Sequence, residues 1–357
     1  MTKKRVLTTS LLALVAIAVG CTAWIVKAQS YAFTEQRVDI PVTNALADGG
    51  STPDAHTGGS LHAVLTVPKS GGGKRPLVVL VHGDGAANAS RDDAYQAVRE
   101  AFADAGYATL SWDKAGVNGA PGDWLAQSLA DRGAEVGAAL DWAHTRPEID
   151  ADNMGAWGVS QAGWVLPAIA DRRDDLRFLV IVGGAVNWLR QGEFNLSAEL
   201  RADGASDETR RAAFDRRTRN VAMFERGATY DEYVASGVDA EPMSRARYGF
   251  VMRNFRADAT GDLDRIAVPT LLLLGTADRN VDVVETERVY RDHVPPNLLT
   301  VRTFDGASHS LTRDDIEYRP DDLGVFFRAV FAPRSIFAPG YLDALTSFAV
   351  DQKTPRA

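Results

Sequence analysis

The sequence Gly-Val-Ser-Gln-Ala-Gly at residues 158–163 decides the fold. It follows a short apolar segment at 154–159 and opens a predicted helix over 161–173. A serine on a sharp turn between a strand and a helix, with small residues around it, is typical of a nucleophile elbow. The small residues matter because the turn strains the serine backbone and a bulky neighbour would collide with the strand or the helix. Ser160 is therefore the candidate nucleophile.

Apolar runs alternate with helix-length segments along the rest of the chain. Strands are predicted at 77–81, 107–112, 154–159, 178–183, 270–275 and 298–304, and helices at 91–105, 124–146, 161–173, 283–293 and 341–351. The polar stretch 44–60 is expected to be a loop that interrupts an N-terminal β region. This alternation predicts an α/β fold with a doubly wound, mostly parallel sheet. Ligands bind at the carboxyl ends of such strands, where all the candidate residues lie.

The candidates for a general base are few, because the chain contains six histidines. His309 is the only one on a loop beyond the last predicted strand and downstream of Ser160. The others lie in the polar N-terminal region, directly after a strand, within a helix or at a helix end: His56, His62, His82, His144 and His293. The position of His309 makes it the candidate base, which would remove the serine proton.

The candidate acid lies between these two residues in sequence. Asp278 follows the strand at 270–275 directly, where its carboxylate could hold the tautomer of His309 and stabilise its protonated form. Asp282 and Asp305 are the competing carboxylates. Asp282 is the second choice, because an acidic residue at the start of a helix is a good cap without any chemistry.

A glycine-rich turn, His-Gly-Asp-Gly at 82–85, follows the strand at 77–81. Such a turn can present a backbone N–H to the nucleophile, and the residue after the serine presents another. The amides of Asp84 and Gln161 are therefore assigned to an oxyanion hole. The carboxylate of Asp84 would repel a developing oxyanion, so its side chain is expected to point away from the site.

Together these landmarks resemble the α/β-hydrolase superfamily, and more narrowly the bacterial serine esterases close to dienelactone hydrolase and the prolyl-oligopeptidase-type hydrolases. The matching landmarks, in family order, are HGDG at 82–85, WDKAG at 112–116, GVSQAGW at 158–164 followed by Pro167, GTAD at 275–278 and GASH at 306–309. The resemblance spans residues 61–350 and includes the chain order Ser, Asp, His. Ala162 and Ala115 depart from the pattern, where glycine and arginine are usual. Asp113 and Lys114 are expected to make structural contacts.

About ninety residues separate the strands at 178–183 and 270–275, which is too long for a simple crossover. This segment is rich in Arg, Asp and scattered aromatic residues, and we expect a mostly helical lid at about 187–262. Most of its aromatics should pack the lid against the body, and some should line an apolar pocket for an acyl or alcohol group.

The first 28 residues form a separate unit, ahead of a hydrolase domain at 29–357. Basic residues at 3–5 precede residues 10–26, which carry no charge and would span roughly 25 Å as a helix. A cleaved signal peptide, a retained anchor and a lipoprotein site at Cys21 are all compatible with this pattern. Each alternative predicts an exported catalytic domain in the cell envelope or outside the cell, touching the membrane only through this segment. The lone cysteine excludes an intramolecular disulfide.

The composition of the chain excludes several classes of partner and cofactor. The formal net charge of −8, from 39 basic and 47 acidic side chains, argues against nucleic acid as a partner. The sequence has neither a cysteine–histidine cluster for zinc nor a glycine-rich phosphate loop, so no metal and no cofactor are expected. The resulting hypothesis is a serine hydrolase that cleaves small-molecule carboxylic esters through an acyl-enzyme. A peptidase or thioesterase with the same triad, and an inactive envelope binding protein, are the alternatives.

Overall fold

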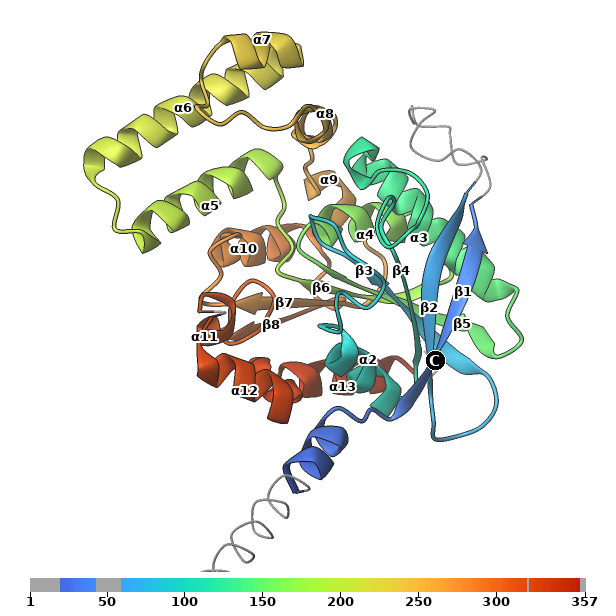
Figure 1. Cartoon of the computed structure of the whole chain (residues 1–357). Helices are drawn as coiled ribbons and strands as arrows, with labels where there is room; N and C mark the ends of the chain where they lie inside the picture. The colour runs from blue at the N-terminus through green and yellow to red at the C-terminus, as the bar shows by residue number, and fades with distance from the viewer. Residues whose placement is uncertain (1–19, 43–58, 320, 354–357) are drawn as a thin grey trace, which may run out of the picture.

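The protein is built on a single mixed sheet. The computed structural model describes residues 20–42, 59–319 and 321–353. Within them, an eight-stranded sheet has the order β1-β2-β4-β3-β5-β6-β7-β8 (Figure 1). The strands are β1 (Phe33–Pro41), β2 (Ser60–Pro68), β3 (Arg75–Val81), β4 (Ala108–Trp112), β5 (Ile149–Val159), β6 (Leu176–Val182), β7 (Thr270–Gly275) and β8 (Leu299–Phe304). β1 and β2 pair antiparallel, β2 joins β4 antiparallel, and all other neighbours are parallel.

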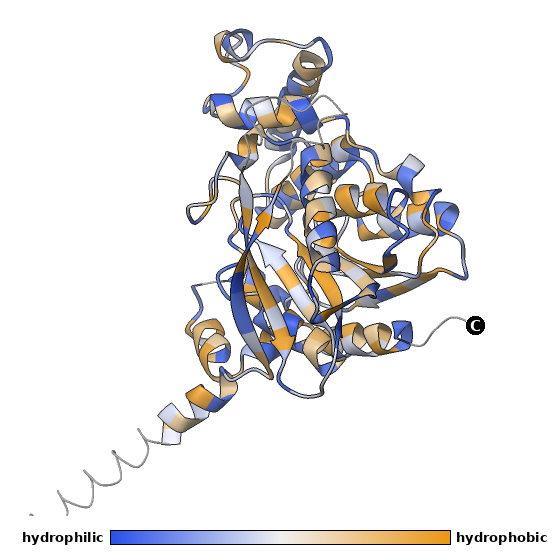
Figure 2. Cartoon of the chain, turned by 90° about the vertical axis from the view of Figure 1, so that its right-hand side faces the viewer, coloured by the Kyte–Doolittle hydropathy of each residue, from blue (hydrophilic) through white to orange (hydrophobic). Residues whose placement is uncertain are grey.

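Helices cover both faces of this sheet, as the sequence predicts. α2 (Gln96–Asp104) and α13 (Tyr341–Gln352) pack on one face, while α3 (Leu129–His144), α4 (Ala162–Ala170) and α10 (Val283–His293) pack on the other. Alternate residues of β3 enter opposite clusters: Leu77 and Val79 face one, and Val78 faces the other. A strand buried on both faces reads as a continuous apolar run, which is why β3 was predictable. Figure 2 shows hydrophobic residues, coloured orange, in strands of the sheet.

Three predicted helices are shorter than expected, and one of them, predicted over 161–173, is helical only in α4. The segment 124–146 divides into η2 (Trp124–Ala126) and α3, because Ser128 starts a new helix with a capping box to Asp131. The segment 91–105 becomes helical only at Gln96. Its first residues, 91–93, have φ between 51° and 67°, so the backbone there is left-handed and cannot form an α-helix. Residues 44–58 of the predicted loop 44–60 lie outside the described residues, and Ser60 begins β2.

The segment between β6 and β7 forms a helical insertion, shown above the sheet in Figure 1. It contains α5 (Trp188–Ala202), α6 (Asp207–Glu225), α7 (Tyr230–Ala235), α8 (Arg245–Asn254) and α9 (Thr260–Leu263). Its two ends meet, because Asn187 and Asp258 form an isolated antiparallel bridge and their side chains hydrogen-bond at 2.9 Å. The insertion therefore leaves and re-enters the body at one place.

The aromatic residues of the insertion do not pack as expected. We predicted that most of them pack against the body, but the insertion has a small core of its own, made of Met223, Phe224, Ala228, Tyr233, Tyr248, Val251 and Phe255. Two aromatic contacts join it to the body: Trp188 stacks on Trp164, and Phe250 packs at a steep angle against Trp124. The insertion is thus a separately packed layer, joined to the body by these aromatic contacts and by side-chain hydrogen bonds from α5 and α8.

The C-terminal part adds α11 (Asp314–Glu317), α12 (Leu323–Phe331) and η3 (Pro333–Ile336) before α13. At the other end of the chain, residues 20–28 are helical and precede β1. Residues 1–19, which hold most of the predicted leader, lie outside the described residues. In the described parts of the chain, no helix has the length and apolar character needed to cross a membrane.

Candidate active site

Ser160 lies on a tight turn between β5 and α4. Its φ of 56° is in the left-handed region, which a non-glycine residue adopts at a cost in strain. The turn is held by the Ser160 N–H, which donates to the Val182 carbonyl of β6 at 2.8 Å. A Cβ at Gly158 would lie 2.5 Å from the Ala162 Cβ, so the alanine methyl fits only because residue 158 has no side chain. The turn therefore places the hydroxyl at the carboxyl end of the sheet.

His309 and Asp278 form a buried pair on the loops after β8 and β7. His309 Nδ1 lies 2.8 Å from Asp278 Oδ2. The other carboxylate oxygen accepts the backbone N–H groups of Asn280 and Val281, at 2.7 and 2.9 Å. Because a carboxylate accepts, Nδ1 carries the proton, and Nε2 is free to accept another. Burial lowers the pKa of His309, but the hydrogen bond and charge of Asp278 outweigh it, so the pKa is raised above its ordinary value.

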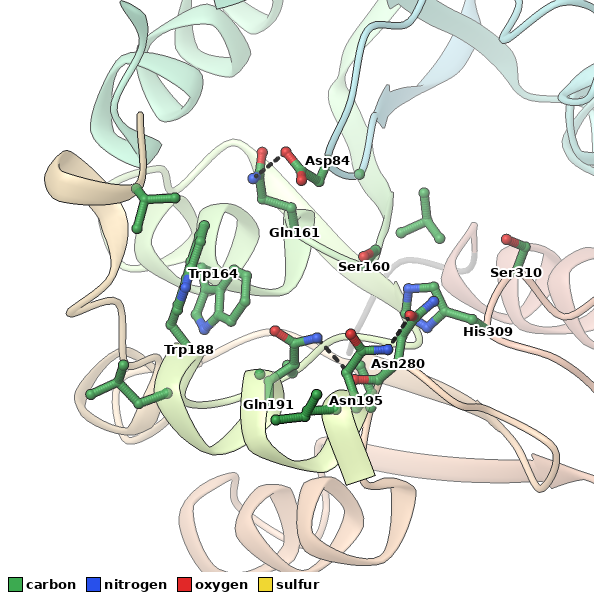
Figure 3. A pocket seen from close by; sticks show the side chains of 18 of the residues that line it. Asp84, Ser160, Gln161, Trp164, Trp188, Gln191, Asn195, Asn280, His309 and Ser310 are labelled. Atoms are coloured by element: carbon green, nitrogen blue, oxygen red, sulfur yellow. Dashed lines mark hydrogen bonds between the residues drawn. The ribbon is translucent and has the colours of Figure 1, made fainter. Parts of the chain in front are cut away.

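The structure brings Ser160 and His309 to the same pocket (Figure 3). Ser160 hydrogen-bonds to Val182 at the end of β6. Gly183, which follows Val182, contacts the histidine, because a Cβ on Gly183 would lie 3.1 Å from His309 Nδ1. Within the described part of the chain, the serine hydroxyl and the imidazole do not hydrogen-bond to each other. Such bonds are often long in the absence of substrate and tighten in the reacting complex.

The His-Gly-Asp-Gly turn lies directly beside the serine. A Cβ at Gly83 would be 3.0 Å from the Ser160 Cβ, so only glycine lets the turn approach this closely. Lys114 is buried behind the turn, and its Nζ donates to the carbonyls of Gly83 and Gly85 at 2.5 and 2.7 Å. In a trans peptide the carbonyl and the following N–H point in opposite directions. By binding the Gly83 carbonyl, Lys114 therefore directs the N–H of Asp84, in the same peptide group, away from the lysine.

The carboxylate of Asp84 binds the insertion. Arg247 of α8 donates to both of its oxygens, at 3.1 and 2.7 Å. Gln161 Nε2 donates to the same carboxylate at 3.3 Å, a contact drawn in Figure 3. Burial raises the pKa of Asp84, but Arg247 and the Gly85 N–H outweigh it, so the pKa is lowered and the side chain is ionised at neutral pH. The side chain is thus turned toward Arg247, which supplies the opposite charge.

A second arginine, Arg132 of α3, supports this region from within the body. It is fully buried and donates to the Gln161 Oε1 at 2.7 Å and to the His82 carbonyl at 2.9 Å. His82 itself is buried, and its Nε2 lies 2.8 Å from the Trp112 carbonyl. Burial, with help from Lys114, lowers the pKa of His82 well below its ordinary value. His82 is therefore a neutral structural residue rather than a base.

The remaining candidates have structural partners. Asp282 caps α10 by accepting the N–H groups of Val284 and Glu285, as expected, and Asp305 accepts from the Thr276 hydroxyl. His144 and His293 pair with Asp175 and Asp264 in exposed positions. His62 lies on β2 near Asp39, and His56 is outside the described residues. Asp113 accepts the Ala89 N–H and the Asn118 amide, so its contacts are structural.

A pocket of about 760 Å³ opens at Ser160 between the sheet and the insertion. The body supplies the serine, the histidine and the His-Gly-Asp-Gly turn, and α5, α6 and α8 supply the opposite wall. The charged residues of its lining are Arg91, Arg216, Arg217, Arg247 and Asp84, together with His309. The apolar lining includes Trp164, Trp188, Leu189, Leu196, Val221 and Phe224.

The arginines of this site and the amides of α5 could not be recognised from the sequence. Arg132 and Arg247 reach Gln161 and Asp84 from positions far away in the chain, and no local pattern marks them. Gln191 Nε2 of α5 donates to the Asn280 carbonyl at 2.9 Å, next to the loop that carries Asp278 (Figure 3).

The sheet order, the serine turn after β5, the carboxylate after β7 and the histidine after β8 define an α/β hydrolase. Residues 72–316 match the family of serine aminopeptidases called S33, and the chain belongs to that family. The resemblance to the α/β-hydrolase superfamily is thereby confirmed, and the protein is a hydrolase. No curated protein matches the sequence.

Solved structures share the fold at low sequence identity. The carboxylesterase EstE1, from a metagenomic library, is 16% identical with a TM-score of 0.52, and the match covers 93% of each chain. Est1E of Butyrivibrio proteoclasticus, solved with ferulic acid, is 17% identical with a TM-score of 0.53, covering 83% of this chain and 96% of that one. An esterase of Pyrococcus furiosus is 14% identical with a TM-score of 0.51, covering 85% and 92%. At these identities the likeness concerns the fold alone.

Proposed function

We propose that the protein is a serine hydrolase that cleaves small-molecule carboxylic esters through an acyl-enzyme intermediate. The observation that carries the proposal is the buried His309–Asp278 pair, in which His309 lines the same pocket as Ser160. A base oriented by a carboxylate beside a serine on a strained turn is the constellation for nucleophilic acyl transfer.

In the first half of the reaction, the Ser160 hydroxyl attacks the ester carbonyl while His309 Nε2 takes its proton. The negative charge that develops on the carbonyl oxygen is accepted by the N–H groups of Asp84 and Gln161. Protonated His309 then gives its proton to the leaving alcohol, and Asp278 stabilises the imidazolium. In the second half, His309 removes a proton from water, which attacks the acyl-enzyme and releases the acid and free Ser160.

The charges of the pocket favour an ester substrate over the peptide substrate of an aminopeptidase, which carries a free ammonium group. An aminopeptidase must bind the ammonium group of its substrate, which calls for a free carboxylate near the nucleophile. Among the residues described as lining the pocket, Asp84 is the only carboxylate, and Arg247 already binds it through two hydrogen bonds. Three further arginines in the lining disfavour a cation still more. The family's name nevertheless makes an aminopeptidase the second candidate.

The test compares wild type with Ser160→Ala on a panel of p-nitrophenyl esters, acyl thioesters and aminoacyl anilides. We expect ester turnover in the wild type and a loss on the order of a million-fold in the variant, as in a comparable triad. A fluorophosphonate probe should label wild type and leave the variant unlabelled. Turnover of the variant near the wild-type rate would refute the nucleophile. A wild-type preference for anilides or thioesters would refute the substrate class, and an unlabelled wild type would favour a binding protein.

A further inference from the structure

Helix α12 is almost entirely apolar, yet none of its residues is buried. Its sequence, LGVFFRAVF at 323–331, is apolar apart from Gly324 and Arg328. Leu323, Phe326 and Phe327 are 73%, 58% and 54% exposed. A soluble surface rarely carries large apolar side chains side by side without a partner. The ring centroids of the two phenylalanines are 5.7 Å apart, so they form one continuous patch.

The helix at residues 20–28 extends this patch. Trp24 and Val26 are 60% and 66% exposed, and the Trp24 indole N–H donates to the Phe331 carbonyl at the end of α12. Gln29 donates to the Ala329 and Val330 carbonyls, at 3.2 and 3.1 Å. Of the eight large hydrophobic side chains that are exposed in the described residues, these two helices carry five. The two helices therefore form one joint apolar surface, here called the α12 surface (residues 20–29 and 323–331).

Hydrogen bonds from Arg334 hold the N-terminal helix to the body of the protein. Arg334 of η3 donates to the Ala28 and Ser30 carbonyls, at 2.6 and 2.9 Å, and pairs with Glu100 of α2. These contacts fix where the N-terminal helix leaves the body. Figure 1 shows that helix, in blue, and α12 on the side of the molecule opposite to the insertion. The α12 surface thus lies away from the pocket.

The chain itself indicates what covers this surface. Residues 10–19 contain no charged residue and lead directly into the helix at 20–28. An apolar segment of this kind partitions into lipid, and its entry point would bring α12 to the same bilayer. Tryptophan is typical of the lipid–water boundary, and phenylalanine and leucine are typical of the lipid-facing side of a helix that lies in it. A second copy of the chain would cover α12 but would leave residues 10–19 without a partner.

We propose that the α12 surface lies on a lipid bilayer, so that the protein contacts the membrane through α12 as well as through its N-terminal segment. The bilayer accommodates the exposed side chains of Leu323, Phe326 and Phe327, while Trp24 lies at the boundary. The pocket and the insertion then face away from the lipid. This proposal is independent of the reaction that the pocket catalyses.

Hydrogen exchange on the full-length protein tests it, with and without vesicles of phosphatidylethanolamine and phosphatidylglycerol. We expect amide exchange in α12 to slow by about tenfold or more on vesicles, because lipid excludes water from an interfacial helix. Exchange in α7 and α10, which carry the exposed Val234 and Val284, should not change. Unchanged exchange in α12 would refute the proposal. Protection that appears without lipid and rises with protein concentration would also refute it, in favour of a second copy.

A pair of variants separates lipid contact from folding. L323Q/F326Q/F327Q should make exchange in α12 insensitive to vesicles, while thermal unfolding stays near wild type because these side chains are exposed. The matched control V234Q/V284Q also replaces exposed apolar residues, but it should leave the vesicle effect on α12 intact. If the triple variant keeps full protection on vesicles, the three side chains do not contact lipid and the proposal is wrong.

Discussion

Removing Arg247 should slow the reaction by leaving a negative charge beside the proposed oxyanion hole. Arg247 is the group that pairs with both oxygens of Asp84, whose backbone N–H is assigned to the oxyanion. In Arg247→Ala the carboxylate stays ionised without this partner. Two like charges about 6 Å apart, at an effective dielectric constant of about 20, repel by roughly 2.8 kcal/mol. The Asp84 side chain is 40% exposed, so solvent reduces this to about 1–1.5 kcal/mol.

A penalty of this size corresponds to a loss in kcat of about tenfold. The assay is steady-state kinetics on a neutral p-nitrophenyl ester. The decisive variant is the double substitution R247A/D84N, which removes the uncompensated charge and keeps the backbone amide. It should recover most of the lost kcat. Arg245→Ala is the matched control, because Arg245 lies on the same helix and pairs with the exposed Asp231 away from the pocket. We expect it to keep the wild-type kcat.

Two results would refute this reasoning. If Arg247→Ala kept the wild-type kcat, the charge of Asp84 would not reach the reacting carbonyl. If the double variant were no faster than Arg247→Ala, the arginine would act only by holding α8 in place. A change confined to KM would likewise point to substrate binding rather than to the oxyanion.

Two further predictions concern the turn beside the serine and the histidine. Lys114→Met removes the donor to the Gly83 carbonyl and frees the Asp84 peptide to rotate, so kcat should fall by about tenfold to a hundredfold with little change in KM, as measured on the same ester. An unchanged kcat would show that the turn is rigid without the lysine. Because the pKa of His309 is raised and the base must be neutral, kcat/KM should fall as the pH drops through that raised value. Asp278→Asn should move this inflection to lower pH, and an inflection that stays in place in the pH profile would contradict the assignment.

The fold and the positions of the candidate residues could be predicted because both follow from local patterns. Strands such as β3 and β7 are buried on both faces and therefore appear as uninterrupted apolar runs. The carboxyl ends of parallel strands share one edge, so Ser160, Asp278 and His309 were expected at one edge from their places after β5, β7 and β8. The positions of these residues after their strands are enough to predict the shared edge.

What the sequence did not predict depends on contacts between distant segments or on unusual backbone conformations. The start of α2 was misplaced because residues 91–93 adopt left-handed φ values that their side chains do not indicate. The pairing of Arg247 with Asp84 joins residues 163 positions apart, and an arginine on a polar helix gives no sign of its partner. No pattern predicted α12 either, because an apolar run of nine residues resembles a buried element and this one is not buried.

The helical insertion binds both loops that the proposed chemistry requires. Through α8, Arg247 binds the His-Gly-Asp-Gly turn at Asp84. Through α5, Gln191 and Asn195 bind the loop after Asp278, with Asn195 Nδ2 donating to the Arg279 carbonyl at 3.1 Å. A movement of the insertion that widens the pocket must therefore break hydrogen bonds to the His-Gly-Asp-Gly turn, to the loop after Asp278 or to both. If the proposed mechanism holds, these contacts couple its catalytic geometry to the position of the insertion, because both loops are held in the arrangement seen here.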